Sequence, residues 1–204
     1  MTETKSQREY IPGLGKQFLM PLYDVVHHVF GLRPIHREMI TLAGLRDGHR
    51  VLDVGCCTGN LLRSTGKLHP EVDLVGLDPD GQSLRRAGRK ARRAGVTVRL
   101  DRGFAQELPY PDASFDRVFS SLMLHHLDGP SKDALLSEVR RVLRPDGMLI
   151  LADAVVSSGS GRMRDHVDGA VSQRIAGAGF AVEPTRTMGL RIGGRVGIEV
   201  ARPS

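Results

Sequence analysis

The sequence has few aromatic residues and almost no cysteine. Trp is absent and aromatic residues make up only 4% of the 204 residues, so Val, Leu, Ile and Ala have to fill the core. The only two cysteines, Cys56 and Cys57, are adjacent, which excludes a disulfide framework and a metal site of the CxxC kind. We therefore expect a protein of a reducing compartment, with no bound metal.

Long apolar segments are also absent. No stretch approaches the roughly 18 apolar residues of a membrane-spanning helix. The first residues of the chain are polar and do not form the apolar core of a signal peptide. We therefore expect a soluble cytoplasmic protein.

The bulk composition is that of a folded domain. Hydrophobic residues make up 40% of the chain and charged residues 25%, which provides a sizeable core and excludes a disordered chain. The length suits one domain. The 29 Lys and Arg residues outnumber the 23 Asp and Glu residues, for a net charge of +6. This charge is compatible with nucleic acid, anionic membrane surfaces or acidic ligands, and it selects none of them.

Apolar runs of strand length alternate with segments of helical spacing. The predicted strands are 50–54, 72–77, 96–100, 115–120 and 147–152, and the helices between them are 58–68, 81–94 and 131–143. After a Ser- and Gly-rich linker at 157–161 and a helix at 163–178, residues 180–188 and 195–201 are predicted to form an antiparallel β-hairpin. The pattern predicts an α/β fold with a doubly wound, Rossmann-like, mostly parallel seven-stranded sheet.

The N-terminal part differs from the rest. Residues 1–46 contain two predicted helices, at about 18–30 and 34–43, and we expect them to form a helical cover or lid. Residues 47–204 carry the alternating strands and helices. The two parts are expected to form one structural domain.

The loop after the first predicted strand carries a ligand-binding pattern. In an open α/β sheet, ligands bind at the carboxyl ends of the strands, and here this edge has the sequence VLDVGCCTGN at 51–60. A dinucleotide fingerprint would need Gly where Cys57 and Asn60 stand, so NAD is disfavoured. Asp78, 25 residues after Asp53, ends the second strand and is placed to accept hydrogen bonds from ribose hydroxyls.

Five motifs follow one another with plausible spacing. They are VLDVGCCTGN at 51–60, GLDP at 76–79, GFAQELPYPDASFDRV at 103–118, LHHL at 124–127 and RVLRPDGML at 141–149. Together they resemble the class I S-adenosylmethionine-dependent methyltransferases, in the subgroup (methyltransferase type 11) that contains the ubiquinone and menaquinone biosynthesis C-methyltransferases. The resemblance covers about half of the chain, from Val51 to Asp153.

The resemblance implies S-adenosylmethionine as cofactor, with S-adenosylhomocysteine as product. Gly55, Cys56 and Thr58 should hold the methionine part through backbone and hydroxyl contacts, with Asp53 beneath the loop. Cys57 stands where the family usually has Gly, and a side chain is tolerated there only if φ is negative. We therefore expect Cys57 to keep φ below zero.

The other cofactor-binding residues follow from the later motifs. Asp78 and Pro79 should bind the ribose, and Phe104 and Ala105 should flank the adenine. Phe104 replaces the Asp that commonly accepts from the adenine amino group, so selectivity is expected to rest on backbone groups such as the Ala105 N–H. The pocket should be closed after the fourth strand by Ser121 and Leu122.

Catalysis and acceptor binding leave alternatives open. His125 and His126 lie just beyond the fourth strand and are candidates for a general base, although a His in this turn could equally pack or bond to backbone. In the N-terminal cover Tyr10, Phe18 and Tyr23 are candidates for acceptor binding, and the alternative is that they only close the core.

The resulting expectation is an enzyme that methylates a small organic acceptor. One alternative is an RNA- or DNA-directed methyltransferase, suggested by the basic run at 85–93, which also fits the solvated face of a helix. Another is a non-catalytic, cofactor-binding partner subunit, since Cys57 and Phe104 depart from the family's motifs.

Overall fold

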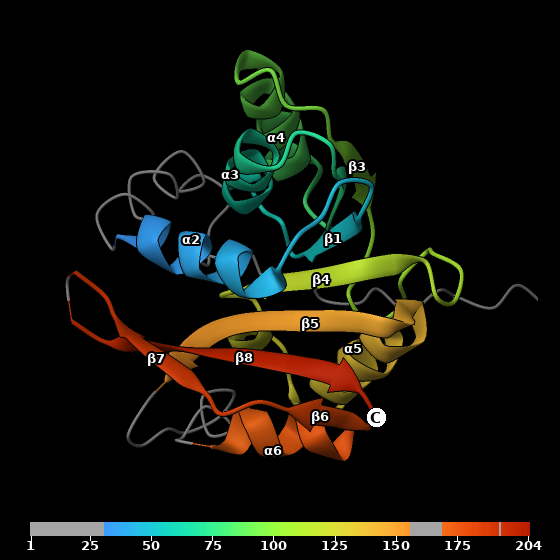
Figure 1. Ribbon diagram of the computed structural model, residues 1–204, viewed down its shortest axis with the longest axis vertical. Coiled ribbons are helices and arrows are strands. Elements are labelled where there is room, and N and C mark those ends of the chain that lie inside the picture. The colour runs from blue at the N-terminus through green and yellow to red at the C-terminus, as the bar shows by residue number, and fades with distance from the viewer. Residues whose placement is uncertain (1–30, 156–168, 192) are drawn as a thin grey trace, which may run out of the picture.

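A single twisted sheet organises the chain (Figure 1), and the computed structural model describes residues 31–155, 169–191 and 193–204. Five parallel strands form one side: β1 (Arg50–Val54), β2 (Asp73–Asp78), β3 (Arg99–Arg102), β4 (Phe115–Ser121) and β5 (Leu143–Val155). Antiparallel strands complete it: β6 (Phe180–Val182), β7 (Arg186–Gly189) and β8 (Arg195–Pro203). The order is β3-β2-β1-β4-β5-β8-β6, with β7 also paired to β8, and the predicted fold class is confirmed.

One predicted strand is two strands in the structure. The run at 180–188 contains Pro184, which has no N–H to donate and interrupts the pairing. β6 and β7 lie on either side of this proline, and both pair with β8. The sheet therefore has eight strands rather than the predicted seven.

Helices cover both faces of the sheet. On one face lie α2 (Leu32–Ala43), α3 (Asn60–Leu68) and α4 (Gly81–Arg93), whose apolar residues share one core cluster. On the other face lie α5 (Gly129–Val142) and α6 (Ala170–Gly177). No helix in the described ranges is long and apolar enough to cross a membrane.

Aliphatic side chains make up most of the core, as the shortage of aromatics predicts. Of the few aromatics, Phe119 belongs to the cluster under α2 and Phe115 to the cluster under α5. Two residues four apart on a regular strand would share a face. The register of β4 against β5 shifts between Phe115 and Arg117, and this irregularity explains why the two rings point to opposite faces.

Candidate functional site

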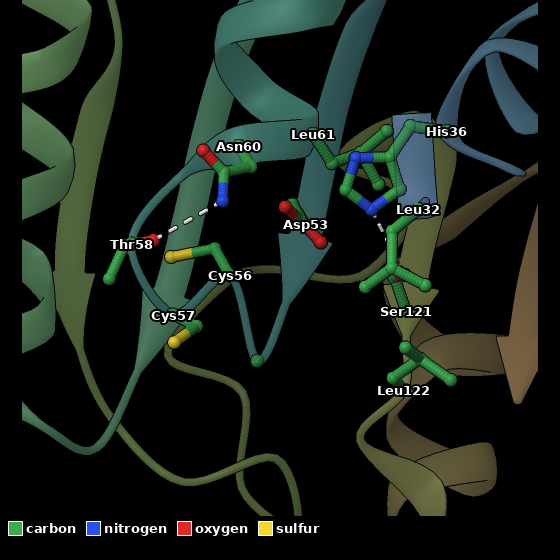
Figure 2. Close-up of a pocket in the computed structure, with 11 residues that line it drawn as sticks. Leu32, His36, Asp53, Cys56, Cys57, Thr58, Asn60, Leu61, Ser121 and Leu122 are labelled. Atoms are coloured by element: carbon green, nitrogen blue, oxygen red, sulfur yellow. Dashed lines mark hydrogen bonds between the residues drawn. The ribbon is translucent and has the colours of Figure 1, made fainter. Parts of the chain in front are cut away.

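The carboxyl edge of the sheet holds a cavity where the strand order reverses, between β1 and β4. The cavity has about 330 Å³ of space, including the part open to solvent (Figure 2). Six predicted cofactor residues line it: Asp53, Gly55, Cys56, Thr58, Ser121 and Leu122. Five further residues complete the lining: Leu32, His36, Cys57, Asn60 and Leu61. A ligand is expected at such a switch point.

Backbone hydrogen bonds fix the loop after β1. The N–H groups of Gly55 and Cys56 both donate to the carbonyl oxygen of Leu77, over 2.8 and 3.0 Å. These two N–H groups are therefore occupied, and the carbonyl oxygen of Cys56 accepts from the Gly59 N–H over 2.8 Å. The carbonyl oxygen of Gly55 is the acceptor that suits an ammonium group. Gly55 has φ +75°, and a Cβ there would lie 2.5 Å from Cγ of Met123. Only glycine fits this position.

The expectation of a negative φ at Cys57 is wrong. Its φ is +49°, in the left-handed region that costs a non-glycine residue about 1–2 kcal/mol. In this conformation the Cys57 N–H points at the sheet edge and donates to Oδ2 of Asp78 over 2.9 Å. Leu122, on the other side of the cavity, also has a positive φ, +54°. Strained backbone of this kind is found preferentially at ligand sites.

Asp78 connects the two neighbouring strand ends. Its Oδ1 accepts from the Asp80 N–H over 2.9 Å, its Oδ2 from Cys57, and the residue is only 6% exposed. Burial raises the pKa of Asp78 to about 6, although both hydrogen bonds act in the opposite direction. Each carboxylate oxygen can accept a second hydrogen bond. Asp78 can therefore receive ribose hydroxyls while it holds the loop.

Asp53 lies beneath the loop at the end of β1. It is 2% exposed, and burial, together with the charge of Asp78, raises its pKa to about 8. At neutral pH the Asp53 carboxyl group is therefore mostly protonated. A protonated carboxyl can donate one hydrogen bond into the cavity as well as accept.

A lysine of the basic helix α4 reaches this loop. Nζ of Lys90 donates to Oγ1 of Thr58 over 3.1 Å and to Oδ1 of Asn60 over 2.5 Å. The same helix buries Leu84, Ala87 and Ala91 against the core. Lys90 thus holds the loop after β1 in place. The helical spacing of the charges at 85–93 had predicted a solvated position for it.

The predicted adenine loop follows β3 and is fastened to Asp78. The Gly103 N–H donates to the carbonyl oxygen of Asp78 over 3.3 Å. Phe104 is 36% exposed, and neither it nor Ala105 lines the cavity beneath the loop after β1. An exposed phenyl ring at this place offers a flat apolar surface to an adenine base.

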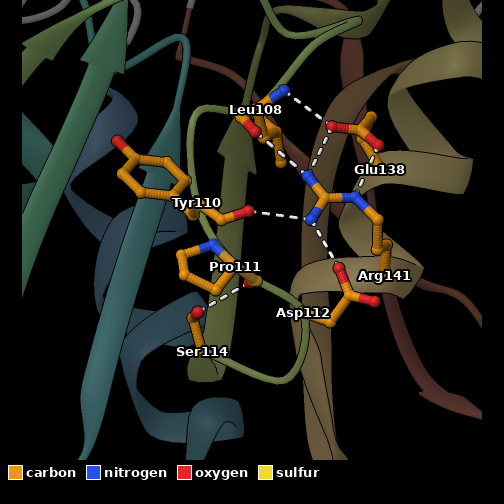
Figure 3. A network of polar contacts seen from close by, with 7 residues as sticks. All are labelled: Leu108, Tyr110, Pro111, Asp112, Ser114, Glu138 and Arg141. Atoms are coloured by element: carbon orange, nitrogen blue, oxygen red, sulfur yellow. Dashed lines mark hydrogen bonds and ion pairs between the residues drawn. The ribbon is translucent and has the colours of Figure 1, made fainter.

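Arg141 of α5 holds the far half of this loop (Figure 3). Its guanidinium donates to the carbonyl oxygens of Leu108 and Tyr110 over 3.0 and 2.8 Å, and to the carboxylates of Asp112 and Glu138. Glu138 in turn accepts from the Leu108 N–H over 2.7 Å. This planar fork of donors fixes the loop conformation in a way that a single ammonium cannot.

The two histidines after β4 differ in their surroundings. Nδ1 of His125 lies 2.5 Å from Oδ1 of Asp153, and the His125 N–H donates to Oδ2 of the same carboxylate over 3.1 Å. Asp153 lies two residues before the end of β5, is 3% exposed, and also accepts from the Ala154 N–H over 2.7 Å. The ring of His126 lies against that of His125, with centroids 4.1 Å apart. Asp153 therefore orients His125 specifically.

Known proteins share both the sequence and the fold. The family model described as "Methyltransferase domain" matches residues 51–147. A demethylmenaquinone methyltransferase of Deinococcus radiodurans is 34% identical over 66% of this chain and 56% of its own length. A 27-O-demethylrifamycin SV methyltransferase of Amycolatopsis mediterranei is 38% identical over 53% of this chain and 40% of its own. The chain thus spans about half the length of these relatives.

The fold comparison agrees. The crystal structure of the [4+2]-cyclase SpnF superposes with a TM-score of 0.77 over 92% of this chain and 94% of its own, at 18% identity. Residues 51–147 are thus similar in sequence to a methyltransferase domain, and the fold is that of the SpnF structure.

Two residues near the site were missed by the sequence reasoning. His36 of α2 is 5% exposed and has Nε2 3.3 Å from Oγ of Ser121 at the cavity. It stands four residues after Leu32 on the buried stripe of the helix, so a polar residue at a core position was the available signal. Asp153 had no such local signal, because its partner His125 is 28 residues away.

The residues predicted to bind the acceptor, Tyr10, Phe18 and Tyr23, lie outside the described residues.

Proposed function

We propose that this protein binds S-adenosylmethionine at the carboxyl edge of its sheet and transfers the methyl group to a small organic acceptor. The observation that carries the proposal is the hydrogen bond from the Cys57 N–H to Asp78. It joins the glycine-containing loop after β1 to a buried acceptor carboxylate at the end of β2. In folds of this kind, the ribose of a bound nucleoside is held by an acidic residue at this position.

The residues at this edge fit the three parts of the cofactor. Asp78 has acceptor capacity for two ribose hydroxyls. Phe104 offers a surface for the adenine. The carbonyl oxygen of Gly55 and the carboxyl of Asp53 provide acceptors for an ammonium group at the methionine end, where His36 and Ser121 complete the wall. The names of the two relatives, which both describe methylation of small molecules, support the same class of reaction.

His125 is the general base in this proposal. When bound, S-adenosylmethionine supplies a sulfonium methyl group, which an acceptor oxygen attacks as S-adenosylhomocysteine leaves. Asp153 accepts from Nδ1–H of His125, so that Nε2 of the neutral ring keeps its lone pair. Nε2 then takes the proton of the acceptor hydroxyl, and the Asp153 carboxylate stabilises the imidazolium that forms.

The nucleic-acid alternative has weaker support. The basic helix α4 packs its alanines against the core, and its Lys90 is bound to Thr58 and Asn60 of the domain's own loop. Both observations favour a structural role for the helix. The two relatives are named for small-molecule acceptors.

Calorimetric titration with S-adenosylhomocysteine tests the proposal, with NAD as the control ligand. We expect saturable micromolar binding of S-adenosylhomocysteine and no binding of NAD, because the loop lacks the glycines of a dinucleotide site. Absence of S-adenosylhomocysteine binding would overturn the proposed function. Binding would justify a screen of hydroxylated acceptors.

A further inference from the structure

The cavity between β1 and β4 has a basic side chain in its wall. Among the described residues that line it, His36 is the only basic one and Asp53 the only acidic one, and both are buried. Figure 2 shows the His36 ring across the cavity from the loop residues Cys56 and Thr58, with Asp53 between them. A ligand held by the loop after β1 therefore meets His36 on its other side.

The packing of α2 does not call for a polar ring at His36. The residue lies four positions after Leu32 and four before Ile40, on the stripe that the helix buries, where an aliphatic side chain would continue the pattern. Burying an imidazole costs free energy, which its hydrogen bonds only offset. A polar ring at a core position that borders a cavity therefore points to a contact with a ligand.

Ser121 gives His36 a polar partner at the cavity. Nε2 of His36 lies 3.3 Å from Oγ of Ser121, the last residue of β4, and both residues line the cavity. Either group can donate, because a hydroxyl and a ring nitrogen each act as donor or acceptor. An anion in the cavity fixes the direction, since Nε2–H then donates to Oγ and the hydroxyl hydrogen turns to the anion. A carboxylate on this side would receive that donor and lie beside a ring that can carry positive charge.

The surroundings also favour negative charge near His36. At neutral pH Asp53 is mostly protonated, because its pKa is raised to about 8, so it adds little repulsion. Leu32 is the first residue of α2 and lines the cavity, so the positive end of the helix dipole lies near the same wall. The first turn of α2 carries no acidic residue that would compensate it. The wall that holds His36 thus attracts an anionic group.

We propose that His36, together with Ser121, binds the carboxylate of the cofactor's methionine part and makes the site selective for adenosine thioethers that keep this group. The ammonium group of the same amino-acid end then lies on the opposite side of the cavity, at the carbonyl oxygen of Gly55. The inference rests on the proposed function, because it assigns a further contact to the same cofactor. It gives α2 a direct part in cofactor selection.

Three matched ligands test the contact by calorimetry. S-adenosylhomocysteine carries both charged groups, its decarboxylated analogue keeps only the ammonium group, and its deaminated analogue keeps only the carboxylate. We expect the wild type to bind the decarboxylated analogue about tenfold to a hundredfold more weakly than S-adenosylhomocysteine, as the loss of one hydrogen bond to a charged group predicts. In NMR spectra, the ring signals of His36 should shift with S-adenosylhomocysteine and with the deaminated analogue, and stay in place with the decarboxylated one.

Variants of His36 assign the preference to this residue. His36→Phe keeps a buried ring without its nitrogens, so it should bind S-adenosylhomocysteine and the decarboxylated analogue almost equally and keep the penalty for losing the ammonium group. His36→Gln keeps a neutral donor and should retain part of the preference. His49→Phe is the matched control, because His49 accepts from the Arg46 N–H in the turn before β1 and does not line the cavity.

The pattern across the three ligands separates binding from a structural role. A structural role would make His36→Phe weaken all three ligands by the same factor, and this result would overturn the proposal. A full preference for the carboxylate in His36→Phe would overturn it as well. If His36→Phe does not fold, the wild-type series, His36→Gln and the ring signals decide.

The wild-type titrations also separate this inference from the proposed function. Absence of S-adenosylhomocysteine binding in the wild type would contradict the proposed function. Binding of S-adenosylhomocysteine and its decarboxylated analogue with equal affinity would leave the cofactor site intact and contradict the role of His36 alone.

Discussion

The backbone N–H of Cys57 lies 2.9 Å from a carboxylate oxygen of Asp78, and this bond links the loop after β1 to the end of β2. Asp78 is therefore both a structural acceptor for the loop and the proposed ribose ligand. Replacing it should affect cofactor binding in both ways, through the lost ligand contact and through a less ordered loop.

We expect Asp78→Ala to weaken binding of S-adenosylhomocysteine by about 1–3 kcal/mol, the range for losing a charged hydrogen-bond partner. Calorimetric titration measures the effect. Asp73→Asn is the matched control, because Asp73 begins the same strand at the opposite edge of the sheet. Equal affinities of Asp78→Ala and the wild type would contradict the ribose assignment.

Cofactor binding should weaken in acid. The pKa of Asp78 is raised to about 6, so its carboxylate is ionised at neutral pH and becomes protonated as the pH falls through 6. Protonation removes an acceptor for the ribose hydroxyls, and the affinity for S-adenosylhomocysteine should fall by up to about tenfold from pH 6 to pH 5. In Asp78→Asn this fall should disappear. A fall of the same size in that variant would assign the effect to another group.

Replacing Cys57 by glycine should stabilise the fold. The φ of +49° costs Cys57 about 1–2 kcal/mol, and glycine avoids this strain at an entropic cost of about 0.5–1 kcal/mol. We expect Cys57→Gly to raise the free energy of unfolding by up to about 1 kcal/mol in urea denaturation. Cys57→Ala keeps the strain and lacks the thiol. Equal stabilisation by Ala and Gly would show that the thiol, and not the backbone, is unfavourable.

Arg141 should matter for cofactor binding at a distance. Arg141→Ala removes the donors that hold the carbonyl groups of Leu108 and Tyr110, so it should destabilise the fold by about 1–3 kcal/mol and weaken S-adenosylhomocysteine binding. Arg140→Ala, the neighbouring control, removes bonds to Gly179 and Ser204 instead and should leave the affinity unchanged. A similar loss of affinity in both variants would mean that α5 as a whole, and not the loop anchor, is responsible.

His125 and Asp153 should act together in turnover. With the best acceptor from a panel of hydroxylated aromatic compounds, His125→Ala should lower kcat by at least about a hundredfold and leave S-adenosylhomocysteine affinity unchanged. Asp153→Asn should also lower kcat, because Nδ1–H of His125 loses its charged acceptor. His126→Ala is the control. An equal loss of kcat in His126→Ala would refute the assignment of the base.

Much of the site could be predicted because its residues lie at strand ends close in sequence. Asp53 is the second-last residue of β1 and Asp78 the last of β2. The two strands are neighbours in the sheet, so the residue types and their spacing already indicated a shared edge. Cys57 was predicted with the wrong sign of φ. Spacing alone does not reveal that a hydrogen bond to a carboxylate on the next strand compensates for strained backbone.

The sequence by itself determined the alternation of strands and helices, the parallel sheet and the loop that begins the cofactor site, because hydrophobic period and glycine placement are local properties. Only the tertiary structure decided which distant groups meet. His125 meets Asp153 because β4 and β5 are parallel neighbours, and Glu199 lies opposite Leu151 because β8 returns antiparallel to β5. Strand order and register arise from packing of the whole sheet, and no local pattern encodes them.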